Sequence, residues 1–131
     1  MSTTFADVAE GVRAAISAYT HALDDGRTDD VVATFCPDGG CDMPGLGRHE
    51  GHDALRAAYE KAKPRRPQRH VAVNTLVTEW SDREATAISD VIFLLLGDAG
   101  WEIRLVGRYH DTLHYDGRAW RFHHRAVEFV T

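Results

Sequence analysis

The sequence of 131 residues has no apolar run long enough to cross a lipid bilayer, since its longest is Val91–Leu96. The segment Met1–Thr4 has neither the basic nor the apolar stretch of a signal peptide. Cysteine is also scarce, and Cys36 and Cys41 follow neither a CxxC nor a zinc-type spacing. In a chain without an export signal, such cysteines are expected to be reduced structural thiols. We therefore expect a cytoplasmic protein with no membrane partner.

Positive charge is too sparse for a nucleic-acid-binding surface. The chain has 15 lysines and arginines against 20 acidic residues, which gives a net charge of -5. Its one basic cluster, Lys61–Pro67 extended by Arg69, contains two prolines and has the composition of a solvated connection. An acidic domain with one short basic loop is not expected to bind nucleic acid.

The eight histidines follow no familiar metal-binding spacing. His110 and His114 share a strand face but stand about 13 Å apart at about 3.3 Å per residue. His123 and His124 are expected on opposite faces of their strand. Without an HxH, HExxH or facial-triad pattern, the sequence predicts neither a metal site nor a cofactor.

Apolar residues recur at helical spacing in the first half of the chain, which is expected to fold as one domain. They predict a helix over residues 5–25, capped by Thr4 and closed by Gly26, and a short helix from Thr28. Pro37–Gly40 is expected to end that helix before a short strand at residues 41–43. A third helix is predicted over about residues 52–62.

The second half of the chain has a β pattern from His70 onward. Short turns separate four predicted strands, at residues 69–80, 84–96, 101–115 and 119–130. Because short turns join antiparallel neighbours, these strands should form a meander. Helices followed by a strongly curved antiparallel sheet predict an α+β fold, with the helices packed on one face of the sheet.

Three of these strands each place one ionisable side chain among apolar neighbours. Asp90 falls between Ile88 and Ile92, Asp111 lies on the apolar face of its strand, and His124 follows Trp120 and Phe122 at alternate positions. Burying an unpartnered charge costs several kcal/mol, so either function or pairing is expected. The available partners are one another and Arg125.

His70 is the most informative residue, because it lies in the segment Arg69–Asn74 where the helical half gives way to the β half. On a strand, His70 and Asn74 should point to the same face. If that face borders a pocket, His70 is the natural proton-transfer group, since imidazole both accepts and returns protons near neutral pH.

Six stretches together resemble SnoaL-like domains over essentially the whole chain: Ile16–Asp29, Phe35–Gly39, Gly51–Tyr59, Arg69–Asn74, Gly107–Asp111 and Trp120–Arg125. The resemblance implies the NTF2-like, or cystatin-like, cone, in which a curved sheet wraps around helices and encloses a deep apolar pocket. That fold hosts many unrelated activities, so it does not by itself define the function.

Within that superfamily the pattern is most similar to the dehydratase and lyase branch, which includes scytalone dehydratase, bile-acid dehydratases and a dehydrochlorinase. The resemblance implies that His70 and Asp24 form a catalytic pair, with Tyr19 as a third member. Ketosteroid isomerase is also similar, at Tyr19 and at Asp111. Its general base would fall at Met43, however, which cannot accept a proton.

The sequence thus predicts a cofactor-independent lyase of dehydratase type that acts on a small hydrophobic molecule bearing a carbonyl group. His70 would move the proton, Asp24 would orient His70, and Tyr19 would hydrogen-bond the substrate oxygen. A polyketide cyclase or ketosteroid-type isomerase, and a non-catalytic ligand-binding or accessory subunit, remain alternatives. Further substrate-binding candidates are Asn74, Asp90, Asp111, His124, Phe35, Met43, Leu55, Tyr59, Ile92 and Tyr109.

Strand 84–96 is apolar on both of its faces. One face can line the pocket side of the sheet, which leaves the other to be covered by a partner. A homodimer formed through the sheet is therefore expected.

Overall fold

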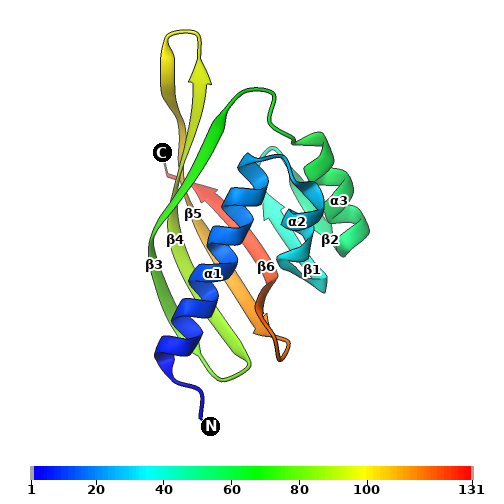
Figure 1. Cartoon of the computed structure of the whole chain (residues 1–131), viewed down its shortest axis with the longest axis vertical. Coiled ribbons are helices and arrows are strands. Elements are labelled where there is room, and N and C mark those ends of the chain that lie inside the picture. The colour runs from blue at the N-terminus through cyan, green and yellow to red at the C-terminus, as the bar shows by residue number, and fades with distance from the viewer. Residues whose placement is uncertain (1, 131) are drawn as a thin grey trace.

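Three helices and the six strands of one sheet make up the computed structural model, which describes residues 2–130 (Figure 1). The helices are α1 (Phe5–Asp24), α2 (Thr28–Ala33) and α3 (His52–Lys61). The strands are β1 (Phe35–Met43), β2 (Gly47–Glu50), β3 (Gln68–Trp80), β4 (Glu84–Gly97), β5 (Gly100–Tyr115) and β6 (Trp120–Phe129). The predicted α+β architecture is confirmed.

Helix α1 begins and ends where the local chemistry requires. Thr4 accepts a hydrogen bond from the Asp7 backbone, and the Asp7 carboxylate accepts one from the Thr4 backbone, which completes a capping box. Gly26 follows the helix at a φ of 71°, a left-handed conformation that glycine adopts without strain. Between these ends, the apolar stripe that includes Val12 and Tyr19 is buried against the sheet.

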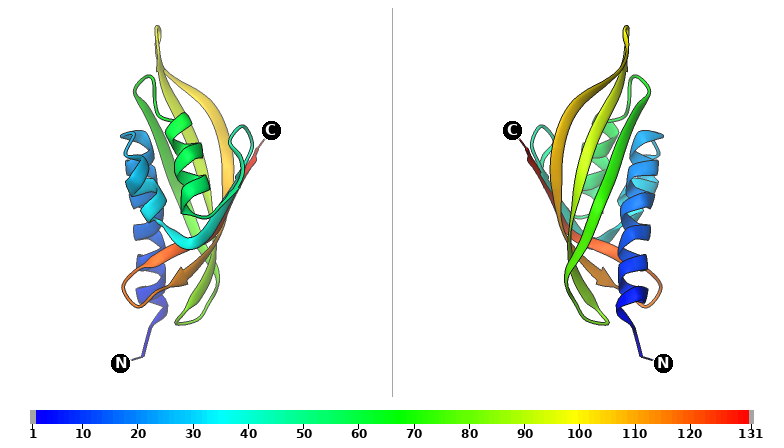
Figure 2. Two further views of the ribbon diagram at one scale, coloured as in Figure 1. Left: turned by 90° about the vertical axis from the view of Figure 1, so that its right-hand side faces the viewer. Right: turned by 90° about the vertical axis from the view of Figure 1, so that its left-hand side faces the viewer.

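The sheet has the strand order β2-β1-β6-β5-β4-β3, and β3 to β6 form the predicted antiparallel meander. Figure 2 shows the sheet curving around one side of the molecule, with the helices in its concave face. Strand β1 runs parallel to β6 and starts at Phe35, earlier than expected. The register of β1 shifts between Phe35 and Gly40, so Pro37–Gly40 forms a bulge inside this strand. The sequence instead predicts that this segment ends the second helix and precedes the strand. Strand β2 was not predicted.

Irregularities in pairing decide which side chains face the helices. In β4 the inner face is formed by alternate residues that include Ala85, Ala87 and Val91, so Asp90 and Ile92 lie on the outer face, contrary to the prediction. In β6, Phe122 pairs with Leu113 while His124 pairs with Thr112, which leaves His123 as an extra residue.

The consequence of this bulge is that Arg125, not His124, is buried beyond it. A third irregularity affects Asn74, which has a φ of 56° and lies in a register shift of β3. Its amide donates to Asp90 at 3.1 Å on the outer face, so it does not share the inner face with His70 as expected.

A fully buried ion pair lies at the centre of the inner face. Arg125 Nε donates to Asp111 Oδ1 at 2.8 Å, and both side chains are completely inaccessible to solvent. The guanidinium carbon also lies 3.6 Å from the ring centre of Tyr109, 4.3 Å from that of Tyr19 and 4.4 Å from that of Phe122. The expectation that Asp111 is either paired or functional is thus met by pairing with Arg125.

Both cysteines are free and buried. Among residues 2–130, no helix is long and apolar enough to cross a membrane.

Removing Arg125 should strongly destabilise the protein, because it leaves the Asp111 carboxylate buried and unpaired. For Arg125→Ala we expect the free energy of unfolding in urea to fall by about 3–5 kcal/mol. The paired replacement Arg125→Met with Asp111→Leu should lose much less, since it leaves no charge behind. In the exposed Arg48–Glu50 pair, Arg48→Ala should change stability by under about 0.5 kcal/mol. Equal effects at both pairs would contradict this account.

Candidate active site

The candidate site is organised around His70 at the start of β3 and Asp24 at the end of α1. His70 Nδ1 lies 2.6 Å from Asp24 Oδ1, and the His70 backbone N–H donates to Asp24 Oδ2 at 2.7 Å. An ionised carboxylate only accepts hydrogen bonds, so this contact assigns a proton to Nδ1. The other ring nitrogen, Nε2, is therefore left for a molecule in the adjoining cavity.

Asp24 is a buried carboxylate with three hydrogen-bond donors. Besides the two from His70, the Gln68 amide donates to Oδ1 at 3.2 Å. Burial raises the pKa of Asp24, but the hydrogen bonds and the charge of His70 outweigh it, so the net pKa lies below the ordinary value. These donors also offset the unfavourable position of a carboxylate at a helix C-terminus. Asp24 therefore stays ionised and fixes the tautomer and orientation of His70.

The face of the His70 ring is also fixed, by packing against an aromatic side chain. The Phe93 ring stacks on it, with ring centres 4.6 Å apart and an angle of 26° between the planes. Only 16% of the His70 side chain is exposed. With Asp24 at its edge and Phe93 on its face, the imidazole has little freedom to turn away from the cavity.

The adjoining cavity has a volume of about 230 Å³ and a largely apolar wall. Its polar side chains are His70, Gln68 and three tyrosines. The complete lining is Tyr19, Leu23, Met43, Pro44, Leu46, Tyr59, Ala62, Gln68, His70, Val91, Phe93, Leu105, Tyr109, Val127 and Phe129. A larger depression of about 740 Å³ lies beside α1, but its ionisable residues, such as Asp30 and Arg118, are on the surface. The smaller cavity is the one that combines apolar walls with a positioned proton-transfer group.

The three cavity tyrosines are neutral hydrogen-bonding groups. Burial raises the pKa of Tyr109 to about 12 and raises those of Tyr19 and Tyr59 well above the ordinary value. The Tyr19 and Tyr59 hydroxyls bond to each other at 2.7 Å. The Tyr109 hydroxyl forms no side-chain hydrogen bond with any residue between 2 and 130, which leaves it available to a ligand. Among the described lining residues, His70 is therefore the one whose side chain offers a basic nitrogen to the cavity.

The sequence-predicted site residues separate into three groups. The first group lines the cavity and consists of His70, Tyr19, Met43, Tyr59 and Tyr109. Asp24 lies outside the lining and accepts a hydrogen bond from the His70 ring. Phe35 and Leu55 are wholly buried in the core outside the cavity lining, and Asp111 bonds Arg125. Asn74, Asp90, Ile92 and His124 lie on the outer face, so contrary to the prediction they do not line this cavity, for the reasons of register given above.

The sequence did not predict two residues that are important in this site, Gln68 and Phe93. Gln68 precedes the segment taken as a strand, and its bond to Asp24 joins residues far apart in the chain. Phe93 was not among the predicted pocket residues, because strand β4 is apolar on both faces and its pattern does not tell which face is inward. Strand pairing accounts for Phe93, which is the cross-strand partner of His70.

Comparison with known proteins identifies the family. A model of the SnoaL-like domain matches residues 6–126. The chain belongs to the SnoaL-like family. No curated protein sequence matches it at a significant level.

Solved structures place this SnoaL-like domain in the NTF2-like, cystatin-like fold. A protein of unknown function from Mycobacterium tuberculosis is 23% identical with a TM-score of 0.85, covering 92% of this chain and 70% of that one. An NTF2-like protein with a cystatin-like fold from Novosphingobium aromaticivorans is 18% identical with a TM-score of 0.83, covering 97% and 90%. A protein from the same organism, provisionally assigned as a scytalone dehydratase, is 21% identical with a TM-score of 0.81, covering 93% and 83%. At these identities the likeness establishes the fold.

The lowered pKa of Asp24 predicts a loss of stability in acid. Because the folded-state pKa lies below the unfolded value of about 3.9, the contribution of Asp24 is complete above that value and disappears as the pH falls through the folded pKa. Urea unfolding of the wild type and Asp24→Asn should be compared between pH 5 and pH 2.5, where only carboxyl groups titrate. We expect the stability advantage of the wild type to shrink as the pH falls. An advantage that grows in acid would contradict the assigned hydrogen bonds.

Proposed function

We propose that this SnoaL-like domain is a cofactor-independent lyase that eliminates water from a small hydrophobic substrate carrying a carbonyl group. The observation that carries the proposal is the His70–Asp24 pair at the wall of an apolar cavity. A positioned imidazole in such a cavity is suited to removing a weakly acidic proton next to a carbonyl group. Membership of a superfamily that includes dehydratases is consistent with this chemistry but does not decide it.

His70 performs the proton transfers of the proposed reaction. Its Nε2 atom takes the proton from the carbon next to the carbonyl, and the C–H electron pair forms an enolate. The enolate then expels the hydroxyl from the neighbouring carbon, where the C–O bond breaks and a C=C bond forms. The proton on Nε2 passes to the departing hydroxyl, which leaves as water and returns His70 to its starting state.

Asp24 and the tyrosines stabilise the charges that develop. During the reaction His70 carries a proton on both ring nitrogens, and the ionised Asp24 at 2.6 Å stabilises that cation. The negative charge gathers on the substrate oxygen, where a neutral hydroxyl donor is most effective. Tyr109 has an uncommitted hydroxyl, whereas the Tyr19–Tyr59 pair directs its second proton to the Met43 sulfur at 3.8 Å, a weak acceptor that a substrate oxygen would replace. Tyr19 thus acts together with Tyr59 rather than alone.

The cavity limits the size of the substrate. Its volume of about 230 Å³ lies below the range of about 300–1,000 Å³ typical for drug-sized ligands. A substrate with one or two rings fits this volume. The apolar walls contributed by Leu105, Val127 and Phe129 favour a ring system with few polar substituents.

Two other functions use the same geometry. A polyketide cyclase or ketosteroid-type isomerase would also need His70 as base, and product analysis distinguishes ring closure or double-bond migration from loss of water. In a ketosteroid-type isomerase the base position corresponds to Met43, which here contacts Tyr19 with its sulfur 3.8 Å from the hydroxyl. A non-catalytic ligand-binding or accessory subunit would bind ligand without turnover.

Replacing either member of the pair should reduce turnover of a β-hydroxy ketone. In a panel of one- and two-ring β-hydroxy ketones, followed by the absorbance of the enone product, His70→Ala should lower kcat at least tenfold, because it removes the base. Asp24→Asn should also lower kcat at least tenfold, since an amide can present its N–H to Nδ1 and favour the wrong tautomer.

The matched control is His110→Ala, which removes an exposed histidine bonded to Glu128 on the outer part of the sheet. It should leave kcat unchanged. Circular dichroism should establish that all three variants are folded. Full activity in either dyad variant would overturn the mechanism, and tight ligand binding without turnover by the wild type would favour the binding-protein alternative.

We also propose that the protein forms a homodimer through the outer face of the sheet. Cross-strand pairing aligns Val71, Ile92 and Val106 in one apolar row, and Leu94 pairs with Ile103 beside it. Val71, Val106 and Ile103 are 37%, 41% and 67% exposed, respectively. The β4–β5 hairpin projects beyond the helices (Figure 1). A contiguous apolar face of this kind is typical of an interface.

A single charge in this row should disrupt the dimer. For Val106→Glu we expect light scattering at micromolar concentration to give the mass of one chain, 14.6 kDa, where the wild type gives twice that value. His110→Glu, four residues further along β5, is on the same face in a polar region and should leave the dimer intact. A monomeric wild type would contradict the proposal.

A further inference from the structure

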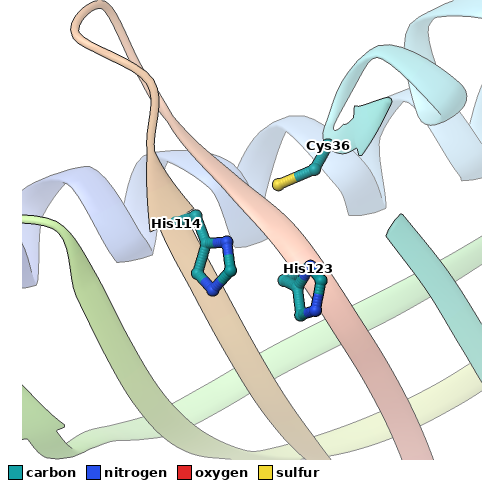
Figure 3. A group of neighbouring side chains, drawn as sticks. All are labelled: Cys36, His114 and His123. Atoms are coloured by element: carbon teal, nitrogen blue, oxygen red, sulfur yellow. The ribbon is translucent and has the colours of Figure 1, made fainter. Parts of the chain in front are cut away.

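A second group of reactive side chains lies on the outer face of the sheet, apart from the cavity. Cys36, His114 and His123 each offer one ligand atom, and these atoms all lie within 4.8 Å of one another. Figure 3 shows the two imidazole rings face to face on neighbouring strands, with the Cys36 side chain reaching toward them from a third. We propose that these three residues bind a divalent transition-metal ion with the preferences of zinc.

The fold brings the three residues together by means of two bulges. His114 lies on the outer face of β5, and His123 is the extra residue of β6 at the register shift. Cys36 lies in the irregular part of β1, between the pairs Phe35–Phe122 and Gly40–His124. Because the ligands come from three strands and depend on bulges, no spacing in the sequence indicated them, and the proposal replaces the expectation of no metal site.

The donor set matches zinc chemistry. A thiolate with two neutral imidazoles is a borderline-soft combination that suits Zn²⁺, and three protein ligands leave one tetrahedral position free. Zn–S and Zn–N bonds of about 2.3 Å and 2.0–2.1 Å require the ligand atoms to approach to roughly 3.5 Å of one another. The rings now stack with centres 4.3 Å apart at 13°, so one ring must turn to aim its lone pair at the ion. Both side chains are 40% exposed, which permits that rotation.

The surroundings of the group favour a cation. Asp38 Oδ1 lies 4.0 Å from His123 Nδ1, and Glu84 Oε2 lies 3.9 Å from His114 Nε2. Each carboxylate can hold its ring by a hydrogen bond or, for Asp38, take the free coordination position. Within the described residues His123 Nδ1 is buried without a hydrogen-bond partner, so a ligand would satisfy it.

The positive charge of Arg121, which borders the group, is already neutralised. The Cys36 thiol donates to the backbone oxygen of Arg121 at 3.6 Å, which places that residue beside the group. The Arg121 guanidinium, however, donates to Asp116 at 2.7 Å. A bound ion would tie the start of β1 to the β5–β6 hairpin, and because the unfolded chain lacks this arrangement, binding would stabilise the fold.

Metal titration of the full chain, without an affinity tag, tests the site. With Co²⁺ as the probe, we expect one equivalent to produce the visible absorption of a tetrahedral ion and a thiolate-to-cobalt charge-transfer band. Zn²⁺ should displace the Co²⁺, abolish both bands, and raise the thermal unfolding temperature. Cys36→Ser should lose the charge-transfer band, and His114→Ala or His123→Ala should weaken Zn²⁺ binding at least tenfold.

Three matched variants separate this site from general metal binding by cysteine or histidine. Cys41→Ala, His110→Ala and His124→Ala alter residues on the same three strands but outside the group, and they should bind like the wild type. Circular dichroism without metal should establish that each variant is folded. Absence of stoichiometric binding to the wild type, or unchanged binding in the three ligand variants, would overturn the proposal. Because the dyad lies on the inner face, neither outcome bears on the proposed elimination.

Discussion

The Asp24 carboxylate is the contact on which the candidate site depends. It joins the last residue of α1 to the first residues of β3, elements that are separated in the chain by two helices and two strands. One oxygen accepts from the His70 backbone and the other from the His70 ring and Gln68, so the carboxylate fixes the strand and the imidazole at the same time. The cost of burying this charge is offset by three donors, and the result is an imidazole with a defined tautomer.

A second buried charge, the Arg125 guanidinium, positions two of the tyrosines that line the cavity. Arg125 is buried against Tyr19 and Tyr109 and anchored by Asp111, so the two tyrosine rings lie on a fixed cation. This arrangement positions hydroxyl groups in an apolar cavity without exposing the guanidinium to a ligand, since Arg125 is absent from the cavity lining. The stability of the core and the geometry of the site therefore depend on the same residues.

Long, regular segments could be predicted from the sequence. Helix α1 has a capping box and a continuous apolar stripe, and β5 alternates cleanly, so their limits and the inward position of Asp111 followed directly. Strand β4 is apolar on both faces, and no local pattern tells which face is inward, so Ile92 was predicted to line the pocket and Phe93 was missed. The pairing of Asp24 with His70 came from family resemblance, because no spacing rule joins residues so far apart.

Bulges account for most of the remaining departures. An alternation rule holds only while two strands keep register, and one extra residue exchanges the faces beyond it. The shift at His123 sends Arg125 inward and leaves His124 outside, and the left-handed Asn74 turns its amide toward Asp90 instead of the cavity. The same irregularities gather His123 and Cys36 beside His114. The sheet thus separates two kinds of chemistry by face: regular pairing presents His70 to the cavity, and irregular pairing assembles the proposed metal ligands on the opposite side.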